Sequence, residues 1–479
     1  MKKTPAKTIP IYPSEADAST ATASLYVAHE KIYPRSVAGR FANWRWGMVF
    51  LTQIVFYGLP WLEWGQRQAV NFDLGARRFY IFGLVLYPQD FIYLTGILVI
   101  SALSLFLFTA IAGRLWCGYA CPQTVYTEIF LWLEKKVEGD RSARMRRDAG
   151  PWTGDKIVRK SGKHLLWIAV SLWTGFTFVG YFTPIRELGY AIVWQQQLGS
   201  WETFWVLFYG FATYGNAGFM REQVCKYMCP YARFQSAMFD KDTLVVSYDT
   251  QRGEPRSAKA RKNRPKTPDI GDCIDCSLCV QVCPTGIDIR NGLQYECIGC
   301  GACADICDTV MDKVGYPRGL VKYTTENAMH QNWSARETLR HVLRPRVLMY
   351  SSILGAVVLA MCISLVLRTP FKVDVVRDRG TLARIVPEGI ENVYRLQIMN
   401  ATESEQHYRI AVQGLPGLTT VAQEEVAVAV EPAQSRWVVV RVQLPFGNAP
   451  AGSHPIHFMI SNEQSAASVA EKSVFIVPR

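Results

Sequence analysis

Cys273-Ile-Asp-Cys276-Ser-Leu-Cys279-Val-Gln-Val-Cys283-Pro284 is the stretch that decides the fold of its part of the chain. A second stretch, Cys297-Ile-Gly-Cys300-Gly-Ala-Cys303-Ala-Asp-Ile-Cys307, repeats the same cysteine spacing. Eight thiols this close together form a metal-ligand pattern, because a disulfide framework spreads its cysteines through a secreted domain. Zinc uses four ligands in two separated pairs, which does not explain two consecutive runs of four. The two runs therefore predict iron–sulfur ligation.

The spacing is that of a bacterial ferredoxin with two [4Fe–4S] clusters, in which three closely spaced thiolates bind one cluster and the fourth cysteine crosses to the other. Gly299, Gly301, Ala302 and Ala304 leave room for the backbone to wrap a cluster and for N–H groups to approach its sulfurs. Asp308 stands where the motif carries a second proline, which leaves the geometry at Cys307 open. The crossing rule defines a first quartet, Cys273, Cys276, Cys279 and Cys307, and a second quartet, Cys297, Cys300, Cys303 and Cys283.

The composition of the whole chain indicates a membrane protein. Of its 479 residues, 49% are hydrophobic and 19% are charged, and there are 14 Trp, 22 Tyr and 23 Phe, which suits anchoring at a bilayer interface. The net charge of +12 comes from Lys and Arg beside apolar runs, which fits anionic lipid. No zinc-finger or helix-turn-helix pattern supports a nucleic-acid partner. Residues 1–24 have no apolar segment behind Lys2 and Lys3, so we expect no cleaved signal peptide.

Five stretches approach the roughly 20 apolar residues that cross a bilayer. We place these spans at 45–64, 90–112, 164–183, 201–220 and 347–367. The first ends near Pro60 and Glu63, and the third and fourth are rich in aromatic residues, so a re-entrant or interfacial helix is the alternative for these three.

Basic residues set the orientation, because Lys and Arg gather in cytoplasmic loops. The loop at 184–200 holds only Arg186, whereas the loop between the second and third spans is strongly basic. We therefore expect a multi-pass protein of the bacterial inner membrane, with the N-terminus and the iron–sulfur region in the cytoplasm and the chain after Arg368 in the periplasm. In this arrangement Arg67, Arg77 and Arg78 lie on the outer side, where they fit the preference of basic residues for cytoplasmic loops least well. The basic loop contains Lys135, Lys136, Arg141, Arg144, Arg146, Arg147, Lys156, Arg159, Lys160 and Lys163.

These boundaries predict a mixed fold in five parts. A cytoplasmic segment (1–40) leads into a four-span α-helical membrane domain (41–240), a ferredoxin-like domain (241–346), a fifth transmembrane helix (347–368) and an immunoglobulin-like β-sandwich (369–479). The sandwich is predicted because short apolar runs alternate there with Gly, Pro, Asn and Ser. It contains no Cys, so an antibody-type disulfide is absent. The predicted strands are 371–376, 393–399, 408–412, 437–442 and 456–460.

A repeated motif lies at the cytoplasmic ends of the second and fourth spans. Cys117-Gly-Tyr-Ala-Cys121-Pro122 matches Cys225-Lys-Tyr-Met-Cys229-Pro230, which indicates a duplicated membrane part. A spacing of four residues on a helix places both sulfurs of a pair on one face, with Cβ atoms roughly 5–6 Å apart. The following proline disfavours helix at the second cysteine and lets the chain turn. We name Cys117, Cys121, Cys225 and Cys229 the membrane-edge cysteines.

Each pair of membrane-edge cysteines is a candidate site for a soft metal ion. Thiolates favour Cu(I), zinc or iron–sulfur chemistry, whereas Cu(II) prefers nitrogen and oxygen. A site that prefers Cu(I) raises the copper potential by about 59 mV per tenfold preference, which favours reduction of arriving Cu(II). The alternatives are buried structural thiols, a redox disulfide or a shared third iron–sulfur site.

Other residues that could bind a soft metal are given structural roles. We interpret Met228 as packing and Cys362 as a buried small apolar residue. We interpret His454, His457 and Met459 as surface or core residues.

The order of these parts resembles the CcoG/FixG family of accessory proteins for cytochrome c oxidase of the cbb3 type. The paired motifs, the two-cluster insert, the late single span and the final sandwich carry the resemblance, which covers the chain beyond about Lys31 and includes Ile32-Tyr-Pro-Arg35. It implies a cupric reductase that supplies Cu(I) for oxidase assembly, with the membrane-edge cysteines as its catalytic and copper-binding residues. Copper chaperones or transporters and oxidase assembly factors are the implied partners, and a homodimer is compatible with the sequence.

The electron donor is left open, because no Rossmann or flavin fingerprint is present. A cytoplasmic protein or a quinol are the two candidates. A similar architecture occurs in the NapH and NosR membrane ferredoxins, so a quinol-linked relay to a partner reductase is one alternative function. The other is a non-catalytic scaffold, in which the sandwich binds assembly partners and the clusters only stabilise the fold.

Overall fold

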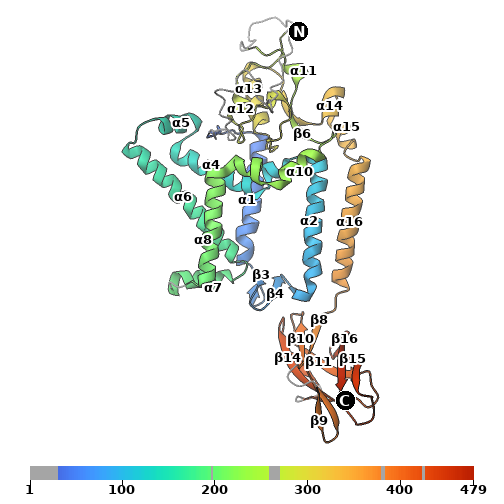
Figure 1. Ribbon diagram of the computed structural model, residues 1–479. Coiled ribbons are helices and arrows are strands. Elements are labelled where there is room, and N and C mark those ends of the chain that lie inside the picture. The colour runs from blue at the N-terminus through green and yellow to red at the C-terminus, as the bar shows by residue number, and fades with distance from the viewer. Residues whose placement is uncertain (1–30, 196–197, 258–269, 379–382, 423–426, 479) are drawn as a thin grey trace, which may run out of the picture.

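The computed structural model describes residues 31–478 except 196–197, 258–269, 379–382 and 423–426. Long helices occupy the middle of the molecule, and the Cys-rich region and the β-sandwich lie at opposite ends of them (Figure 1). This separation is what the predicted orientation requires of a cytoplasmic and a periplasmic domain.

A helix forms at each of the five predicted spans: α1 (Arg40–Gly58), α2 (Phe91–Ala112), α6 (Gly154–Val179), α8 (Ser200–Gly215) and α16 (Pro345–Val366). In the described part of the chain, two helical stretches are long and apolar enough to cross a membrane, Pro88–Ala112 and Pro345–Val366. Both are exposed along nearly their whole length, unlike the core helix of a soluble protein. The number of five spans stays a prediction.

Shorter helices follow α2 and α8 at the end of the bundle nearest the Cys-rich region (Figure 1). Thr153 caps α6 by accepting a hydrogen bond from the backbone of Lys156. The helices after α2 are α3 (Leu115–Tyr119), α4 (Pro122–Glu138) and α5 (Arg141–Ala149). Those around α8 are α7 (Ile185–Tyr190), α9 (Arg221–Gln223) and α10 (Pro230–Met238), with π-helical turns at Ala191–Gln195, Asn216–Met220 and Val224–Met228.

The Cys-rich domain is built on the antiparallel pair β6 (Val245–Tyr248) and β7 (Val321–Thr324). Its core contains Val246, Met311 and Leu320, and partly buried cysteines of the first quartet pack against it. Asp305 accepts hydrogen bonds from the backbone of Phe41 and Ala42, so this domain caps the start of α1. Its helices are α11 (Thr250–Gly253), α12 (Leu278–Gln281), α13 (Ala302–Val314), α14 (Glu326–Gln331) and α15 (Ala335–Arg340).

Two antiparallel sheets form the C-terminal sandwich, with strand orders β12-β14-β10-β8 and β13-β11-β15-β16, and β9 pairs with β10. Alternate residues such as Tyr394, Leu396 and Ile398 are fully buried between the sheets, as expected for strands with one inward face. All five predicted strands are confirmed. The strands are β8 (Phe371–Arg377), β9 (Arg384–Val386), β10 (Gly389–Asn400), β11 (Gln406–Gln413), β12 (Thr419–Ala422), β13 (Val428–Val430), β14 (Ser435–Leu444), β15 (Gly452–Asn462) and β16 (Ser468–Val477).

A small β-structure between α1 and α2, absent from the sequence prediction, joins the bundle to the sandwich. Val85 and Tyr87 share a buried cluster with Met399 and Ala433, and the Tyr87 hydroxyl donates to the carbonyl of Asn400. Arg67 and Arg78 also contact the sandwich, which explains basic residues on this side. The strands are β1 (Glu63–Trp64), β2 (Arg67–Gln68), β3 (Val70–Asp73), β4 (Arg78–Ile81) and β5 (Leu84–Leu86).

One residue assignment was wrong. Cys362 is exposed on α16 and not buried within the protein. The helices α16 and α2 are both apolar and largely exposed, so Cys362 lies on an apolar surface and not in a protein core.

Candidate metal centres

Each predicted quartet lines its own cavity in the Cys-rich domain. Cys283, Cys297, Cys300 and Cys303 line one cavity, and Cys279 also reaches it. The other cavity contains the whole first quartet, Cys273, Cys276, Cys279 and Cys307. The fourth cysteine of each run thus lies at the cavity of the other run, and the assignment of the two quartets as cluster ligands stays a prediction.

The donor sets fit two iron–sulfur clusters better than zinc. Zinc holds four sulfurs about 2.3 Å from one centre, whereas the four thiolates of a cubane cluster bind different irons and stand further apart. Throughout the described residues, no three His, Cys, Asp or Glu side chains are arranged to hold a single metal ion. Burial raises the pKa of Cys279 to about 11 and those of Cys297 and Cys307 to about 12. Cluster binding must therefore release protons from these thiols.

Glycines allow the backbone to wrap the second quartet closely. Gly299 and Gly301 have φ angles of 66° and 73°, in the left-handed region that favours glycine. A Cβ on Gly301 would stand 2.9 Å from the side chain of Phe41. The N–H of Gly299 donates to the sulfur of Cys297 at 3.4 Å, an approach of the kind expected from the sequence.

The two membrane-edge motifs repeat each other in backbone structure. In both, the N–H of the second cysteine bonds to the carbonyl five residues earlier, Cys121 to Trp116 and Cys229 to Val224. Each second cysteine is extended and precedes a proline at the start of a helix, as the sequence predicts. The expected i,i+4 placement on one helical face is wrong, because this wider turn ends the helix before the second cysteine.

The fold brings the two motifs together. Burial raises the pKa of Cys117 to about 11 and that of Cys225 to about 12, and the nearby membrane-edge thiols add to both shifts. Cys121 and Cys229 are among those neighbours. The four sulfurs thus form one cluster, in which Cys117 and Cys225 are neutral thiols at pH 7. In the described part of the chain this cluster, too, lacks three donors placed around one ion.

The membrane-edge cluster packs directly against the second quartet. A Cβ on Gly118 would lie 2.8 Å from the carbonyl oxygen of Gly299 and 2.9 Å from Cα of Cys300. Cys117 and Cys225 pack against a hydrophobic group that includes Cys300 and Ile298. A small cavity is lined by both Cys225 and Cys300. The two thiol centres are therefore neighbours, although they are far apart in the sequence.

Arg114 bridges the same two regions and was missed by the sequence analysis. Its guanidinium donates to the backbone carbonyls of Tyr295, Cys297 and Ala232 and lies 5.1 Å from the centre of the Tyr295 ring. The Tyr295 hydroxyl donates to the carbonyl of Lys226, inside the second motif. One buried cation thus ties both motifs to the loop of the second quartet. Its position directly before Leu115 and the first motif was the available sequence signal.

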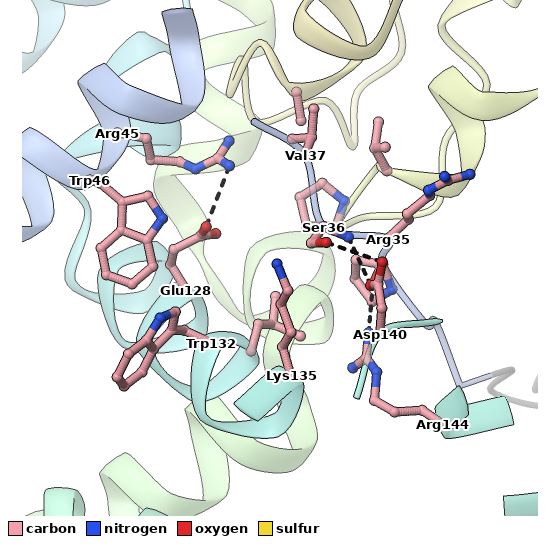
Figure 2. Close-up of a pocket in the computed structure, with 15 residues that line it drawn as sticks. Arg35, Ser36, Val37, Arg45, Trp46, Glu128, Trp132, Lys135, Asp140 and Arg144 are labelled. Carbon is pink, nitrogen blue, oxygen red and sulfur yellow. Dashed lines mark hydrogen bonds and ion pairs between the residues drawn. The ribbon is translucent and has the colours of Figure 1, made fainter. Parts of the chain in front are cut away.

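A polar cavity of about 120 Å³ borders the second quartet (Figure 2). Arg45 reaches Glu128 across it, at 3.4 Å, and Ser36 hydrogen-bonds to Asp140. Pro284 and Ala302, which neighbour Cys283 and Cys303 in sequence, form part of its wall. These contacts join α1 and the segment before it to α4 and the turn after α4, beside the second quartet.

The fold and the two quartets define an iron–sulfur electron-transfer protein with an immunoglobulin-like C-terminal domain. Three family descriptions match its parts. Residues 94–138 match "4Fe-4S binding domain", residues 220–326 match "4Fe-4S dicluster domain", and residues 361–478 match "IG-like fold at C-terminal of FixG". The first match covers Cys117 and Cys121, and the second covers Cys225 and Cys229 with both quartets.

Similar proteins extend over nearly the whole chain. The nitrogen fixation protein FixG of Rhizobium meliloti is 37% identical over 476 residues, 90% of both chains. Protein RdxB of Cereibacter sphaeroides is 42% identical over 82% of this chain and 84% of its own. A crystal structure of a FixG-related protein from Vibrio parahaemolyticus covers 23% of this chain and 97% of its own, with 25% identity and a TM-score of 0.21. The chain belongs to the FixG family.

Proposed function

We propose that this protein reduces Cu(II) to Cu(I) at the membrane-edge cysteines and that the product serves assembly of a cbb3-type oxidase. The observation that carries the proposal is the contact between Gly118 and the Gly299–Cys300 backbone. It places a cluster of four thiols directly beside the loop of an iron–sulfur quartet. When bound, the two clusters supply one-electron carriers, and Cu(II) needs one electron to become Cu(I).

The membrane-edge thiols supply the preference for the reduced ion. Thiolate sulfur is a soft donor and stabilises Cu(I) over Cu(II). Cys117 and Cys225 are neutral before copper binds, because burial raises their pKa to about 11 and about 12. Copper binding must therefore displace their protons. No three of these sulfurs surround one point in the described structure, so we assign one copper ion to two thiolates at a time.

The same proposal includes the membrane arrangement. We place the Cys-rich domain in the cytoplasm, the sandwich in the periplasm and α1, α2, α6, α8 and α16 across the bacterial inner membrane. The opposite positions of the two domains and the basic residues around α5 support it. Copper chaperones and oxidase assembly factors are the proposed partners, with the sandwich as the surface available to periplasmic ones.

The test is reduction of Cu(II) by the purified full-length protein under anaerobic conditions, with dithionite as reductant and Cu(I) detected by a selective chelator. The variant replaces all four membrane-edge cysteines with Ala, and Cys362→Ala is the matched control because Cys362 is exposed on α16. We expect the fourfold variant to lose nearly all protein-dependent turnover and the control to keep it. Unchanged turnover in the fourfold variant would exclude this site.

A second candidate is a third iron–sulfur cluster bound by the membrane-edge cysteines. The match of residues 94–138 to "4Fe-4S binding domain" favours it, because that segment contains only one of the two motifs and neither quartet. Iron analysis separates the two candidates. Two clusters give about eight iron atoms per chain and three give about twelve, and the fourfold Ala variant would lose about four only in the second case.

A further inference from the structure

The cavity of about 120 Å³ between α1, α4 and the segment before α1 has more positive than negative charge in its wall (Figure 2). Because one water molecule needs only about 10–15 Å³ of such space, the cavity has room for several waters or for one phosphate group. Four cations face two carboxylates there: Arg35, Arg45, Lys135, Arg144, Glu128 and Asp140. Lys135 is exposed, so the cavity can be reached from the surface of the protein.

Two of these cations keep hydrogen-bond donors for a further anion. Arg45 contacts Glu128 at 3.4 Å, which is longer than an ordinary N–H···O bond. Its side chain is 7% exposed, and its Nε has no hydrogen-bond partner among the described residues. In the same part of the chain Lys135 forms no ion pair, and its ammonium group points into the cavity between Arg45 and Ser36 (Figure 2). An anion at this point would receive charge-assisted hydrogen bonds from two sides.

The carboxylates of the wall have other partners and do not fill this place. Asp140 accepts from the backbone N–H and the hydroxyl of Ser36, at 3.0 and 3.1 Å. Arg144 pairs with Glu134 outside the cavity, at 2.6 Å. Lys135 is therefore the cation of the wall that is both directed into the cavity and free of an ion pair within the described residues.

The cavity adjoins an exposed apolar row on α1. Trp46, in its wall, is followed on the same helical face by Phe50 and Ile54, which are 60% and 69% exposed. Trp132 of α4 faces Trp46, with ring centres 6.3 Å apart. Tryptophan favours the boundary between lipid headgroups and acyl chains, and basic pockets at that level bind anionic headgroups. A cationic cavity at the head of an apolar row matches both ends of an anionic phospholipid, whereas free phosphate would use only the cavity.

We propose that this cavity binds the phosphate group of an anionic phospholipid and thereby holds the Cys-rich domain at the membrane surface. The inference rests on the membrane arrangement in the proposed function, which places this end of the helices at the cytoplasmic surface. The phosphate lies between Arg45 and Lys135, and the acyl chains follow Phe50 and Ile54. Arg45 also donates to the carbonyl of Cys300 at 3.4 Å, so one side chain links the lipid to the loop of the second quartet.

The test measures lipid binding without copper. The full-length protein with its clusters, in detergent micelles, is titrated with dioleoylphosphatidylglycerol or with dioleoylphosphatidylcholine, and bound lipid is counted by native mass spectrometry. We expect the anionic lipid to bind at least about tenfold more tightly. Lys135→Glu changes the charge by two units and should weaken its binding by about 25-fold, at about fivefold for each charge. Arg45→Lys keeps the charge but loses the planar set of donors, so it should weaken binding less.

Arg146→Glu is the matched control, because Arg146 is exposed on α5 in the same basic region and is not part of the cavity wall. It should keep the affinity of the unmodified protein, and iron content near that of the unmodified protein shows that each variant is folded. The anionic lipid should also raise the temperature at which the iron–sulfur absorbance disappears in this control but not in Lys135→Glu.

Three results would each overturn the proposal: equal weakening in both glutamate variants, equal affinity for the two lipids, or complete displacement of the lipid by inorganic phosphate at the same concentration. The last result would show a site for a free anion. Loss of dithionite-driven copper reduction with intact lipid binding would instead reject the proposed function. Copper reduction that persists without selective lipid binding would reject this inference alone.

Discussion

At the scale of single residues, Arg114 is a cation that acts on both thiol regions. It lowers the pKa of Cys117, Cys225 and Cys297, opposing the larger effect of burial, and it is itself buried. Reduction adds a negative charge, which a nearby cation stabilises. We expect Arg114→Met to lower the reduction potential of the nearest iron–sulfur centre, by about 59 mV for each tenfold loss of stabilisation in a one-electron step.

An anaerobic redox titration followed by electron paramagnetic resonance measures this shift. Arg409→Met is the control, because Arg409 is an exposed residue of the sandwich. Arg114→Lys keeps the charge but loses the branched set of hydrogen bonds, so its potential should fall less. An unchanged potential in Arg114→Met with full iron content would show that Arg114 is only structural.

Asp148 gives the fold a defined sensitivity to acid. Burial alone would raise its pKa, but hydrogen bonds from Lys160, Lys31 and Tyr33 hold it well below the ordinary value of about 3.9. The unfolded chain therefore takes up this proton first as the pH falls. The stabilisation by Asp148 is complete above the unfolded pKa and is lost as the pH falls below about 4.

We expect Asp148→Asn to lower stability at pH 7 by about 1–3 kcal/mol, the usual effect of hydrogen bonds to a charged group. The difference from the unmodified protein should shrink between pH 5 and pH 3, which thermal unfolding at several pH values would show. A constant difference across this range would contradict the assignment. Asp312→Asn is the control, because its ion pair with Arg318 lies at the surface.

Sequence reasoning at this scale found which cysteines of the two runs are neighbours in space. The cysteine spacing predicted both quartets, and each quartet lines one cavity. It could not find Arg114, whose hydrogen-bond partner Tyr295 is 181 residues away. It also gave Gly118 no role, because the contact that forbids a side chain there comes from Gly299 in another domain. Such roles depend on tertiary packing that no local pattern encodes.

At the scale of elements, the proline of each membrane-edge motif predicts where the helix ends but not the hydrogen bonds of the turn before it. The turn before α4 and α10 was predicted, because proline disfavours helix at the residue before it. The wider hydrogen-bonded turn at Cys121 and Cys229 was not, since its backbone bonds leave no distinct residue pattern. The result is that sulfurs from different motifs, and not only those within a pair, become neighbours.

The start of α1 depends on a residue of another element. Asp305 on α13 accepts from the backbone of Phe41 and Ala42, where a helix has unpaired N–H groups, and Gly39 leaves no room for a side chain beside it. We expect Asp305→Ala to cost about 1–2 kcal/mol, as for the loss of an N-terminal cap. Asp305→Asn keeps an acceptor oxygen and should cost less.

The loss of Asp305 should also loosen the Cys-rich domain against α1. The temperature at which the visible iron–sulfur absorbance disappears would measure this effect, with Asp312→Asn as the control on the same helix. Equal temperatures for Asp305→Ala and the control would show that the cap does not contribute to holding the two parts together.

At the scale of the whole molecule, the sequence predicted which domains exist better than how they are joined. The sandwich and five of its strands were predicted because short strand-like runs separated by turn residues are a local pattern. Its attachment was not, because Val85 and Tyr87 come from a region with very short strands, β1 to β5. The basic residues that fitted the membrane arrangement least well, Arg67 and Arg78, contribute to that attachment.

A buried charged contact beside this attachment is the pair between Arg368 and Asp90, at 2.6 Å, with side chains 8% and 2% exposed. Removing one member of a buried pair costs about 3–5 kcal/mol, because the other charge stays buried without its partner. Lys372, 3.5 Å from Asp90, should reduce this cost in Arg368→Ala toward the lower end of that range.

We expect the sandwich of the Arg368→Ala variant to separate from the bundle more often, so that limited proteolysis cuts between α16 and β8. Arg395→Ala, which breaks an exposed pair within the sandwich, should leave the cleavage rate unchanged. Equal protection of both variants would show that the buried apolar cluster around Tyr87 holds the domains without the ion pair. Faster cleavage only in Arg368→Ala would show that the orientation of the sandwich depends on a charge placed just after α16.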